Sequence, residues 1–446
     1  MISTTLTYTL LGSLAGALLL LVLLGFVGKI PISYSLRNLL VRWRITFLTA
    51  LAFTVVVGLL TVLLAFVNGM YKVTEASGQP GNVIVLSDGA TDELFSNLGK
   101  TDTSDVENQQ GVETTDYNGE KVAMCSKEVY MVINQPIPPK PGEKPRRRFV
   151  QVRGIEFPGE IAGRVHGLTL NAGAWFSQAG VQELPGQKVG EGESVIQAVL
   201  GEAVAGELGH DQGKPSLLVG DTFDLGNRKW VVVGLLATHG TTFGSEIWAK
   251  QDLVGKQFGK ERYTSIVLRA KDAEAAQKLA DYLTKNYTKA ALQAQTEMTY
   301  YSKLSETNRQ FLYAIGFVAA VMALGGIFGV MNTMFAAISQ RIKDIGVLRI
   351  LGYYRWQILV TFLLEAMLIG IIGGLIGCAL GYLVNGYSAT SVVSGGQGSN
   401  KTVVLEMTVD HNILALGMLF TLLMAGLGGL LPSVSAMRLK PLDAVR

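Results

Sequence analysis

Histidine and cysteine are scarce in this sequence, whose 446 residues include only four histidines and two cysteines. No two histidines are close enough to form a metal-binding pair on one helix, so we interpret them as surface or structural residues. Cys125 lies in a polar region and Cys378 in a long apolar run, so the two cannot pair with each other. The sequence therefore implies no disulfide framework and no metal site.

Catalytic motifs are missing as well, because the chain has no Gly-x-Ser-x-Gly nucleophile elbow. The stretch GQGSNKT at 396–402 is similar to a phosphate-binding loop, but Asn400 stands where that loop needs a glycine before its lysine. We therefore predict no catalytic, cofactor-binding or metal-binding residue, which disfavours an enzyme with its active site in the polar region 69–310. A net charge of +3 provides no general attraction to nucleic acid.

Charged residues make up only 16% of the chain, whereas soluble domains usually contain about a quarter. Apolar residues are instead concentrated in five runs, each long enough for the roughly 20 residues of a membrane span. The runs are 6–28, 45–67, 311–338, 358–384 and 412–432. None contains a lysine, arginine or aspartate. The pattern predicts a membrane α-helical bundle of about five transmembrane helices.

The distribution of lysine and arginine predicts the orientation of these spans. No cationic residue precedes the run at 6–28 and it lacks an Ala-x-Ala-like cleavage site, so we interpret it as a retained span. Cationic residues gather in 29–44, 339–357 and the tail after 432, whereas the short loop 385–411 has only Lys401. Because such clusters stay in the cytoplasm, we expect a multi-pass protein of the cytoplasmic (inner) membrane with its N-terminus outside.

The same orientation places the long polar region 69–310 outside the cytoplasm. Alternating apolar residues bounded by turn residues predict strands at 82–86, 121–125, 128–133, 147–155, 229–237 and 264–270. Helical patterns occupy 193–208 and 272–287. We therefore expect an extracytoplasmic α+β domain in two lobes. Its Pro-rich, basic stretch at 134–148 is either a solvated hairpin tip or a docking patch for a partner.

A charged segment, RIKDIGVLRILGYYRWQI at 341–358, separates two of the apolar runs. Its apolar residues fall on one helical stripe formed by Ile338, Ile342, Ile345, Leu348 and Leu351. Around the stripe lie the charged residues Arg341, Lys343, Asp344 and Arg355. Gly352 is positioned to end the helix. We expect an amphipathic helix on the cytoplasmic side, which either lies on the membrane or is contacted by a cytoplasmic partner.

Two features inside the spans point to helix packing. Glu365 is the only acidic residue in any apolar run. We expect it to take part in helix–helix packing or in gating and not to bind a proton or a substrate. Glycines at four-residue spacing form small faces along the same run. They are Gly370, Gly373, Gly374, Gly377 and Gly381. We interpret these faces as contacts within a tight bundle or dimer.

The segment 339–358 resembles the coupling helix of MacB/LolC/FtsX-type ABC transporter permeases, which has a pattern near E-R-x-R-E-I-G-x-L-R-A-L-G. The matching residues are Arg341, Ile345, Gly346, Leu348, Arg349, Leu351 and Gly352. Gln340 and Asp344 stand where the family usually has glutamate. The resemblance implies that this helix docks on an ATPase, with Asp344 keeping the charge of the family residue.

Other stretches resemble the same family. The tail 431–446 is similar to its C-terminal signature, and 77–90, 195–209 and 219–243 are similar to its periplasmic core domain. The resemblance implies a domain plan with an extra N-terminal helix at 1–30 and an amphipathic helix with the first core span at 31–68. A MacB-like core domain at 69–310 and an FtsX-like permease domain at 311–446 complete it, with the coupling helix at 339–357.

The resemblance also implies partners and a function. A separate cytoplasmic ABC ATPase would use ATP, while this chain would bind no cofactor. A second permease chain, identical or paralogous, and a periplasmic adaptor are the further partners that the resemblance suggests. The chain would couple ATP hydrolysis to motion of the outer domain, for export or for extrusion of a lipoprotein, peptide or drug. The alternative is a mechanotransmitting complex that activates an extracytoplasmic enzyme without transport.

Overall fold

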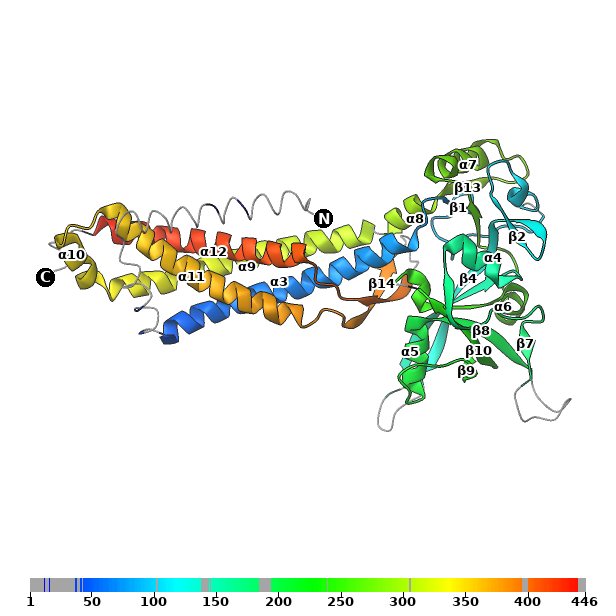
Figure 1. The fold of residues 1–446 in the computed structure, drawn as a ribbon, viewed down its shortest axis with the longest axis horizontal. Helices are drawn as coiled ribbons and strands as arrows, with labels where there is room; N and C mark the ends of the chain where they lie inside the picture. The colour runs from blue at the N-terminus through cyan, green and yellow to red at the C-terminus, as the bar shows by residue number, and fades with distance from the viewer. Residues whose placement is uncertain are drawn as a thin grey trace. The chain divides into compact units, whose positions relative to one another are not determined.

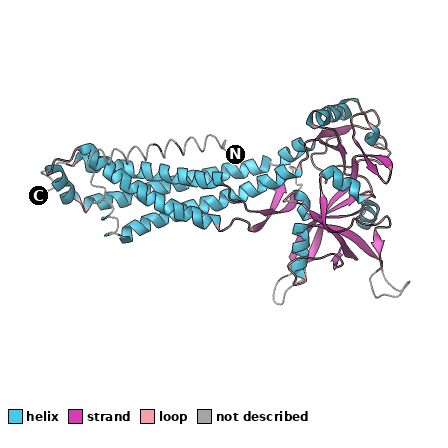
Figure 2. Cartoon of the chain, in the orientation of Figure 1, coloured by secondary structure: helices cyan, strands magenta, loops and turns pink. Residues whose placement is uncertain are grey.

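The computed structural model describes residues 43–439 apart from gaps at 102, 138–143, 145, 184–193, 239, 305 and 395–399, together with Gly12, Gly16, Arg37 and Val41. The chain divides into two compact units. The helical unit comprises Met1–Gly69, Gln310–Tyr387 and Glu406–Arg446. The α/β domain comprises Met70–Arg309 and Ser388–Leu405. Helices make up the first unit and nearly all strands belong to the second (Figure 2).

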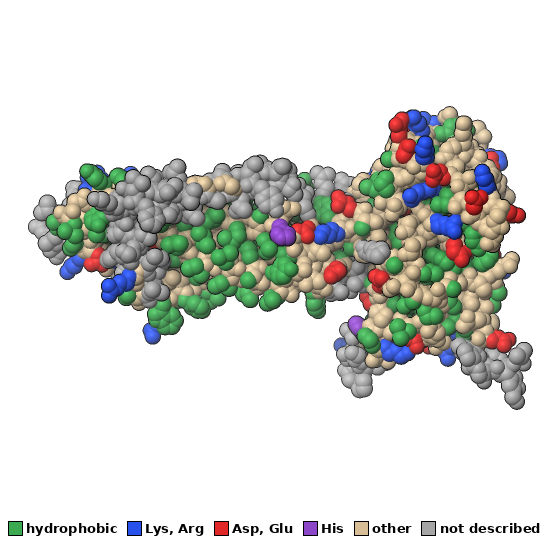
Figure 3. Space-filling view, viewed as in Figure 1, with side chains coloured by type: hydrophobic (Ala, Val, Ile, Leu, Met, Phe, Trp, Pro, Cys, Tyr) green, Lys and Arg blue, Asp and Glu red, His purple; other side chains and the backbone are tan. Residues whose placement is uncertain are grey.

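In the described part of the chain, four helices are long and apolar enough to cross a membrane. They belong to α3 (Trp43–Ser77), α9 (Glu306–Ser339), α11 (Arg355–Tyr382) and α12 (His411–Arg438), and the short α10 (Ile342–Ile350) lies between α9 and α11 in sequence. On the face shown in Figure 3, hydrophobic side chains cover these helices, whereas charged side chains gather on the α/β domain. Four of the five predicted spans are thus confirmed as helices able to cross a membrane, and the run at 6–28 lies outside the described residues, apart from Gly12 and Gly16.

The glycines of α11 bring it against two other helices, as in Figure 1. A Cβ atom on Gly373 would lie 2.5 Å from the Ala50 carbonyl oxygen of α3, and the hydroxyl of Thr54 donates a 3.1 Å hydrogen bond to the Gly373 carbonyl. Gly377 and Gly381 face α3 in the same way, with Thr54 and Thr61 as neighbours. Such close approach of backbones is possible only where no side chain intervenes.

The other glycine face of α11 lies on α12. A Cβ on Gly370 would be 2.7 Å from the Cβ of Ala425, and one on Gly374 would be 2.8 Å from Oγ1 of Thr421. Both faces are therefore occupied inside one chain. Of the two alternatives that the sequence leaves open, the structure shows a tight bundle, and these faces are not available for contact with a second chain.

The α/β domain is built on an 11-stranded mixed sheet in the order β13-β1-β12-β4-β5-β11-β8-β10-β6, with β7 beside β8 and β9 beside β10. The strands are β1 (Asn82–Ser87), β4 (Cys125–Ile137), β5 (Arg146–Ile155), β6 (Thr169–Gly173), β7 (Val181–Gln182), β8 (Val195–Gly201), β9 (Thr222–Leu225), β10 (Arg228–Ala237), β11 (Glu246–Lys250), β12 (Ser265–Arg269) and β13 (Leu292–Thr296). Two small sheets pair β2 (Thr114–Tyr117) with β3 (Glu120–Ala123), and β14 (Ser388–Ser394) with β15 (Asn400–Glu406).

Helices flank this sheet. They are α4 (Gly159–His166), α5 (Glu202–Asp211), α6 (Gln251–Phe258), α7 (Ala273–Asn286) and α8 (Glu297–Leu304), with short 3-10 helices at Val106–Asn108 and Thr242–Ser245. The long strand β4 joins the two halves of the sheet, since residues 125–128 pair with β12 and residues 128–137 pair with β5. The two lobes expected from the sequence are therefore halves of one sheet.

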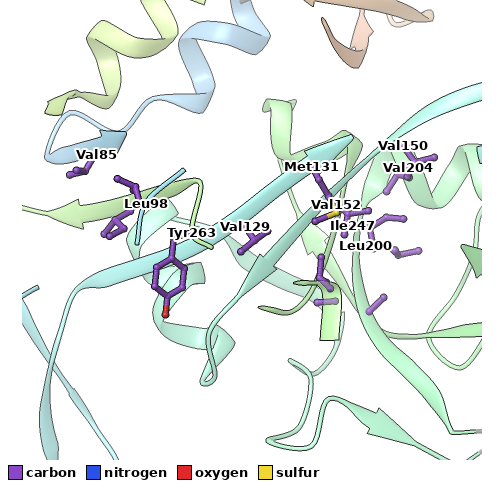
Figure 4. Packing of buried hydrophobic residues seen from close by; sticks show 14 of the residues in the cluster. Val85, Leu98, Val129, Met131, Val150, Val152, Leu200, Val204, Ile247 and Tyr263 are labelled. Atoms are coloured by element: carbon purple, nitrogen blue, oxygen red, sulfur yellow. The ribbon is translucent and has the colours of Figure 1, made fainter. Parts of the chain in front are cut away.

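The apolar core follows this sheet, and Figure 4 shows Val129, Met131, Val152 and Ile247 packed together with side chains from both halves. The structure also corrects the helix predicted over 193–208. Residues 195–201 form the strand β8, and the helix α5 begins only at Glu202. Every residue of β8 is buried, and a strand buried on both faces has the same continuous apolar run as a buried helix.

Candidate functional site

The segment between α9 and α11 contains most of the site residues predicted from the sequence. α9 ends at Ser339, the chain turns at Gln340–Arg341, and α10 begins at Ile342. Gly352 ends the segment with φ +94°, its N–H donating to the Arg349 carbonyl while the N–H of Tyr353 donates to the carbonyl of Leu348. This is the Schellman arrangement, which needs a residue tolerant of a left-handed backbone. Gly352 therefore stops the helix, as the sequence predicts.

The expected stripe from Ile338 to Leu351 is not one helical face. Ile338 belongs to α9, because the turn at Gln340–Arg341 separates the two helices. Of the stripe residues in α10, Ile345 is buried with Ile358 and Phe362 of α11, whereas Leu351 follows the helix and is 70% exposed.

The side chains of α10 divide into an inner and an outer face. Arg341 at its start, Ile345 and Gly346 are buried in the helical unit. Leu348 and Arg349 are half-buried, and Arg349 donates a 3.0 Å hydrogen bond to the Tyr353 carbonyl. The structure therefore corrects the placement of Arg341 and Gly346 among the residues available for docking.

The outer face of α10 is apolar in its second half. Val347 is 53% exposed, and Ile350 and Leu351 are 62% and 70% exposed. Lys343 and Asp344 are exposed at the start of the same face. We call these five residues the outer face of α10. Exposed apolar side chains gathered on one face are typical of a surface that contacts a protein or a membrane.

Arg341 has a partner inside the helical unit. Its Nη1 and Nη2 atoms donate to Oε2 and Oε1 of Glu365 at 2.9 and 3.0 Å. Both side chains are at most 4% exposed, and the guanidinium also lies 5.8 Å from the ring centre of Phe362. The polar residue that the sequence singles out in a span is thus one half of a bidentate ion pair with the residue that begins α10.

The α/β domain contains a buried cluster of charged side chains that the sequence did not predict. Only His166 among its members was considered there, as a surface or structural residue. Its members come from six different segments and are each at most 3% exposed. They are Glu93, Glu128, Arg153, His166, Glu246 and Glu297. The available signal was a charged residue within a strand predicted to be buried, as in RRFVQVRGI at 147–155.

Arg153 is the centre of this cluster. Its Nε and Nη2 atoms donate to the two carboxylate oxygens of Glu246 at 2.6 and 2.9 Å, and Nη1 donates to Glu93 at 2.8 Å. Nη1 also contacts Glu128. One guanidinium on β5 therefore binds carboxylates from β4, β11 and the segment after β1, and so links both halves of the sheet.

His166 provides the second positive charge. Its Nε2 lies 2.6 Å from Oε1 of Glu128, and its Nδ1 lies 3.4 Å from Oε1 of Glu297, the first residue of α8. Burial opposes the charge of the imidazole, but the Glu128 and Glu297 carboxylates outweigh it and raise the pKa of His166 to about 10. Burial likewise opposes ionisation of Glu128, yet Arg153 and His166 hold the pKa of this carboxyl below its usual value.

The raised pKa predicts how stability depends on pH. The contribution of protonated His166 is complete below its ordinary pKa of about 6.5 and is lost as pH rises through about 10. We therefore expect the parent to be more stable than His166→Gln near neutral pH, and the difference to shrink as pH approaches 10. Urea unfolding of both chains, followed by tryptophan fluorescence across this range, measures it. A difference that does not change with pH would mean that His166 is buried neutral.

The described residues include no group of three or more histidine, cysteine, aspartate or glutamate side chains that could hold a metal ion. The carboxylates of the buried cluster are instead engaged by Arg153, His166 and neighbouring donors, including the indole N–H of Trp248 at 3.1 Å from Glu246. This cluster therefore has the arrangement of a structural network, and the outer face of α10 remains the candidate contact site.

Two family models match the chain. Residues 46–286 match the MacB-like periplasmic core domain, and residues 316–441 match the FtsX-like permease C-terminal domain. Among curated proteins, an uncharacterized ABC transporter permease, YknZ of Bacillus subtilis, is 25% identical over 63% of this chain and 67% of its own length. An uncharacterized ABC transporter permease of Methanocaldococcus jannaschii is 27% identical over 53% of this chain and 60% of its own length.

A longer match is the macrolide export ATP-binding/permease protein MacB of Burkholderia lata, 21% identical over 82% of this chain and 52% of the relative. The matched part thus spans from about half to two thirds of these relatives. Among solved structures, the periplasmic region of MacB from Actinobacillus actinomycetemcomitans matches over 52% of this chain and 95% of that structure, with 15% identity and a TM-score of 0.34.

Proposed function

This chain belongs to the family of ABC transporter permeases that combine a MacB-like periplasmic core domain with an FtsX-like permease domain, and on that premise we propose that it couples a separate ATPase to export. In this proposal the ATPase docks on the outer face of α10 in the cytoplasm and hydrolyses ATP. The helices α3 and α9 pass the resulting motion to the α/β domain on the other side of the membrane. The proposed substrate is a lipoprotein, a peptide or a drug extruded from the outer face of the membrane, and macrolide export is the activity named for one relative.

The observation that supports ATPase docking is the exposed apolar ridge of α10. Val347, Ile350 and Leu351 are each more than half exposed, whereas Ile345 and Gly346 of the same helix are buried. Contact of this ridge with a groove of the ATPase would remove apolar surface from water, which favours association. Lys343 and Asp344 beside it would set the orientation of the partner.

The proposal predicts that Val347→Asp abolishes docking. A buried, unpaired carboxylate at the centre of the contact should weaken ATPase binding at least a hundredfold, since such a charge costs several kcal/mol. The measurement is the affinity of the chain in lipid nanodiscs for its purified ABC ATPase, identified by co-purification with the parent chain, together with stimulation of ATP hydrolysis. The control is Arg355→Gln, because Arg355 is the exposed first residue of α11 and does not belong to the outer face of α10. Binding of Val347→Asp at the parent's affinity would refute docking on this face.

The orientation is also part of the proposal and is supported by the cationic segments around the spans. We expect a cysteine at Lys285, exposed on α7, to react with a membrane-impermeant thiol reagent in intact cells, while a cysteine at Lys343 stays unreactive. Both variants are made in a Cys125→Ser background, because that native thiol is partly exposed. Labelling at Lys343→Cys but not at Lys285→Cys would reverse the topology.

A second permease chain completes the proposed complex. Because the glycine faces of α11 are packed within the chain, the support for a second chain comes from α9, where Phe317, Leu324 and Phe328 are each more than half exposed. Two copies carrying different tags should co-purify from membranes in mild detergent if the complex contains a homodimer. Recovery of one tag alone, with the ATPase bound, would leave a paralogous partner as the second chain.

A further inference from the structure

The ion pair between Arg341 and Glu365 is buried deep along α11. Glu365 is ten positions after Arg355, the first residue of the helix, which corresponds to about 15 Å of helix rise. Both partners are at most 4% exposed. Stability alone is a weak reason for such a pair, because the cost of removing both charges from water often equals the gain from their attraction. A bidentate pair does fix the relative orientation of the two groups.

The pair is located where the chain changes direction. Arg341 has φ −114° and ψ 14°, outside the helical range, and its side chain makes no capping hydrogen bond to α10. The turn at Gln340–Arg341 therefore leaves α10 free to swing relative to α9 unless another contact holds it. That contact is to α11, through Arg341 and, one turn further on, through Ile345 packed with Ile358 and Phe362.

Among the described residues, the other end of α10 makes no ion pair to α11, and its contacts are the half-buried Leu348 and the hydrogen bond from Arg349 to the Tyr353 carbonyl. Val347, Ile350 and Leu351 are exposed there, and the segment ends in the turn at Gly352. In the second half of the helix Val347 and Ile350 face outward. A force on the outer face of α10 therefore has two routes to α11, the short connection at 351–354 and, at the start of the helix, the contacts of Arg341 and Ile345.

We propose that Arg341 and Glu365 are positioning residues that lock α10 to α11, so that motion imposed on the outer face of α10 is passed to the membrane helices instead of being lost by rotation at the turn. The proposal rests on the proposed function, because it assigns the inner face of the same helix a role separate from docking. The outer face binds the ATPase, and the inner pair transmits its movement.

The test compares Glu365→Gln and Arg341→Gln with a charge-swapped double variant, Arg341→Glu with Glu365→Arg. The amide hydrogen-exchange rate of residues 342–353, measured in lipid nanodiscs without the ATPase, reports how firmly α10 is held in place. We expect each single variant to exchange at least tenfold faster than the parent and the swapped variant to recover most of the protection. Lys343→Gln, on the outer face, should exchange like the parent. A parent-like rate in both single variants would overturn the proposal.

The second measurement separates positioning from docking. Glu365→Gln should bind the ATPase within about threefold of the parent's affinity but lose at least fivefold of the stimulated ATP hydrolysis, and the swapped variant should regain it. A purely structural role would lower binding and stimulation together, as we expect for Val347→Asp. Loss of ATPase binding in Glu365→Gln would therefore contradict the positioning role of the ion pair. It would not contradict the separate proposal that the ATPase docks on the outer face of α10.

The outcomes remain distinguishable if one variant fails to fold. The neutral double variant, Arg341→Gln with Glu365→Gln, leaves no unpaired charge and replaces the ion pair by an amide pair. It should insert normally, yet still exchange faster at 342–353 and stimulate poorly. Parent-like exchange and stimulation in this variant would show that shape at this position, and not the charge pair, holds α10. If Val347→Asp binds the ATPase normally, the proposal of docking on the outer face of α10 is refuted. The hydrogen-exchange measurement still decides whether the ion pair holds α10.

Discussion

Replacing Arg153 with methionine should destabilise the α/β domain by about 3–5 kcal/mol, because it leaves buried carboxylates without their counter-charge. The guanidinium contacts Glu93, Glu128 and Glu246, and all of these side chains are at most 2% exposed. Urea unfolding of the chain in nanodiscs, followed by the fluorescence of the buried Trp230 and Trp248, measures the loss.

A matched control lies on the same strand. Arg147 is exposed on β5, so Arg147→Met removes an equal charge and adds the same side chain without disturbing a buried partner. We expect a change within about 0.5 kcal/mol for this variant, as for most surface substitutions. Equal effects of the two substitutions would mean that the carboxylates around Arg153 are protonated or hydrated in the folded domain.

Replacing Gly373 with valine should disrupt packing of α11 on α3. The new Cβ would be 2.5 Å from the Ala50 carbonyl oxygen, and backbone cannot move aside as a flexible side chain can. Overpacking of this kind typically costs about 1–3 kcal/mol and more where the backbone is rigid. We expect a clear drop in the thermal midpoint of the detergent-solubilised chain, measured by loss of the monodisperse peak in size-exclusion chromatography after heating.

Gly325→Val on α9 is the control for this prediction. Gly325 is also inside an apolar helix, but a Cβ there meets nothing within 4 Å, so helix propensity changes equally and only the packing differs. This variant should keep a midpoint close to that of the parent. If both variants melt alike, the close approach of α11 to α3 does not contribute to the stability of the helical unit.

Much of the fold could be predicted because its signals are local. A run such as 311–338 cannot be other than a buried or membrane helix, since about 20 uninterrupted apolar residues leave the backbone no other way to satisfy its hydrogen bonds in lipid. The helix predicted at 272–287 was equally clear, because its apolar residues fall on one helical face. The structure shows this helix as α7, with Asp272 as its N-cap accepting a hydrogen bond from the Ala275 N–H. The strand at 195–201 was not, because its burial on both faces removes the alternation that marks a strand.

The candidate site divides in the same way. The sequence by itself determined that a charged helix ending at Gly352 lies between two apolar helices, that Glu365 is an exceptional residue and that α11 has glycine faces, because composition and spacing along the chain carry these facts. Only the tertiary structure decided that Arg341 pairs with Glu365, that Gly346 is buried, and that both glycine faces pack within one chain. The same is true of the buried charges that gather around Arg153. The physical reason is that burial and pairing depend on which segments, far apart in sequence, meet in space, and helical periodicity specifies a face without specifying what that face contacts.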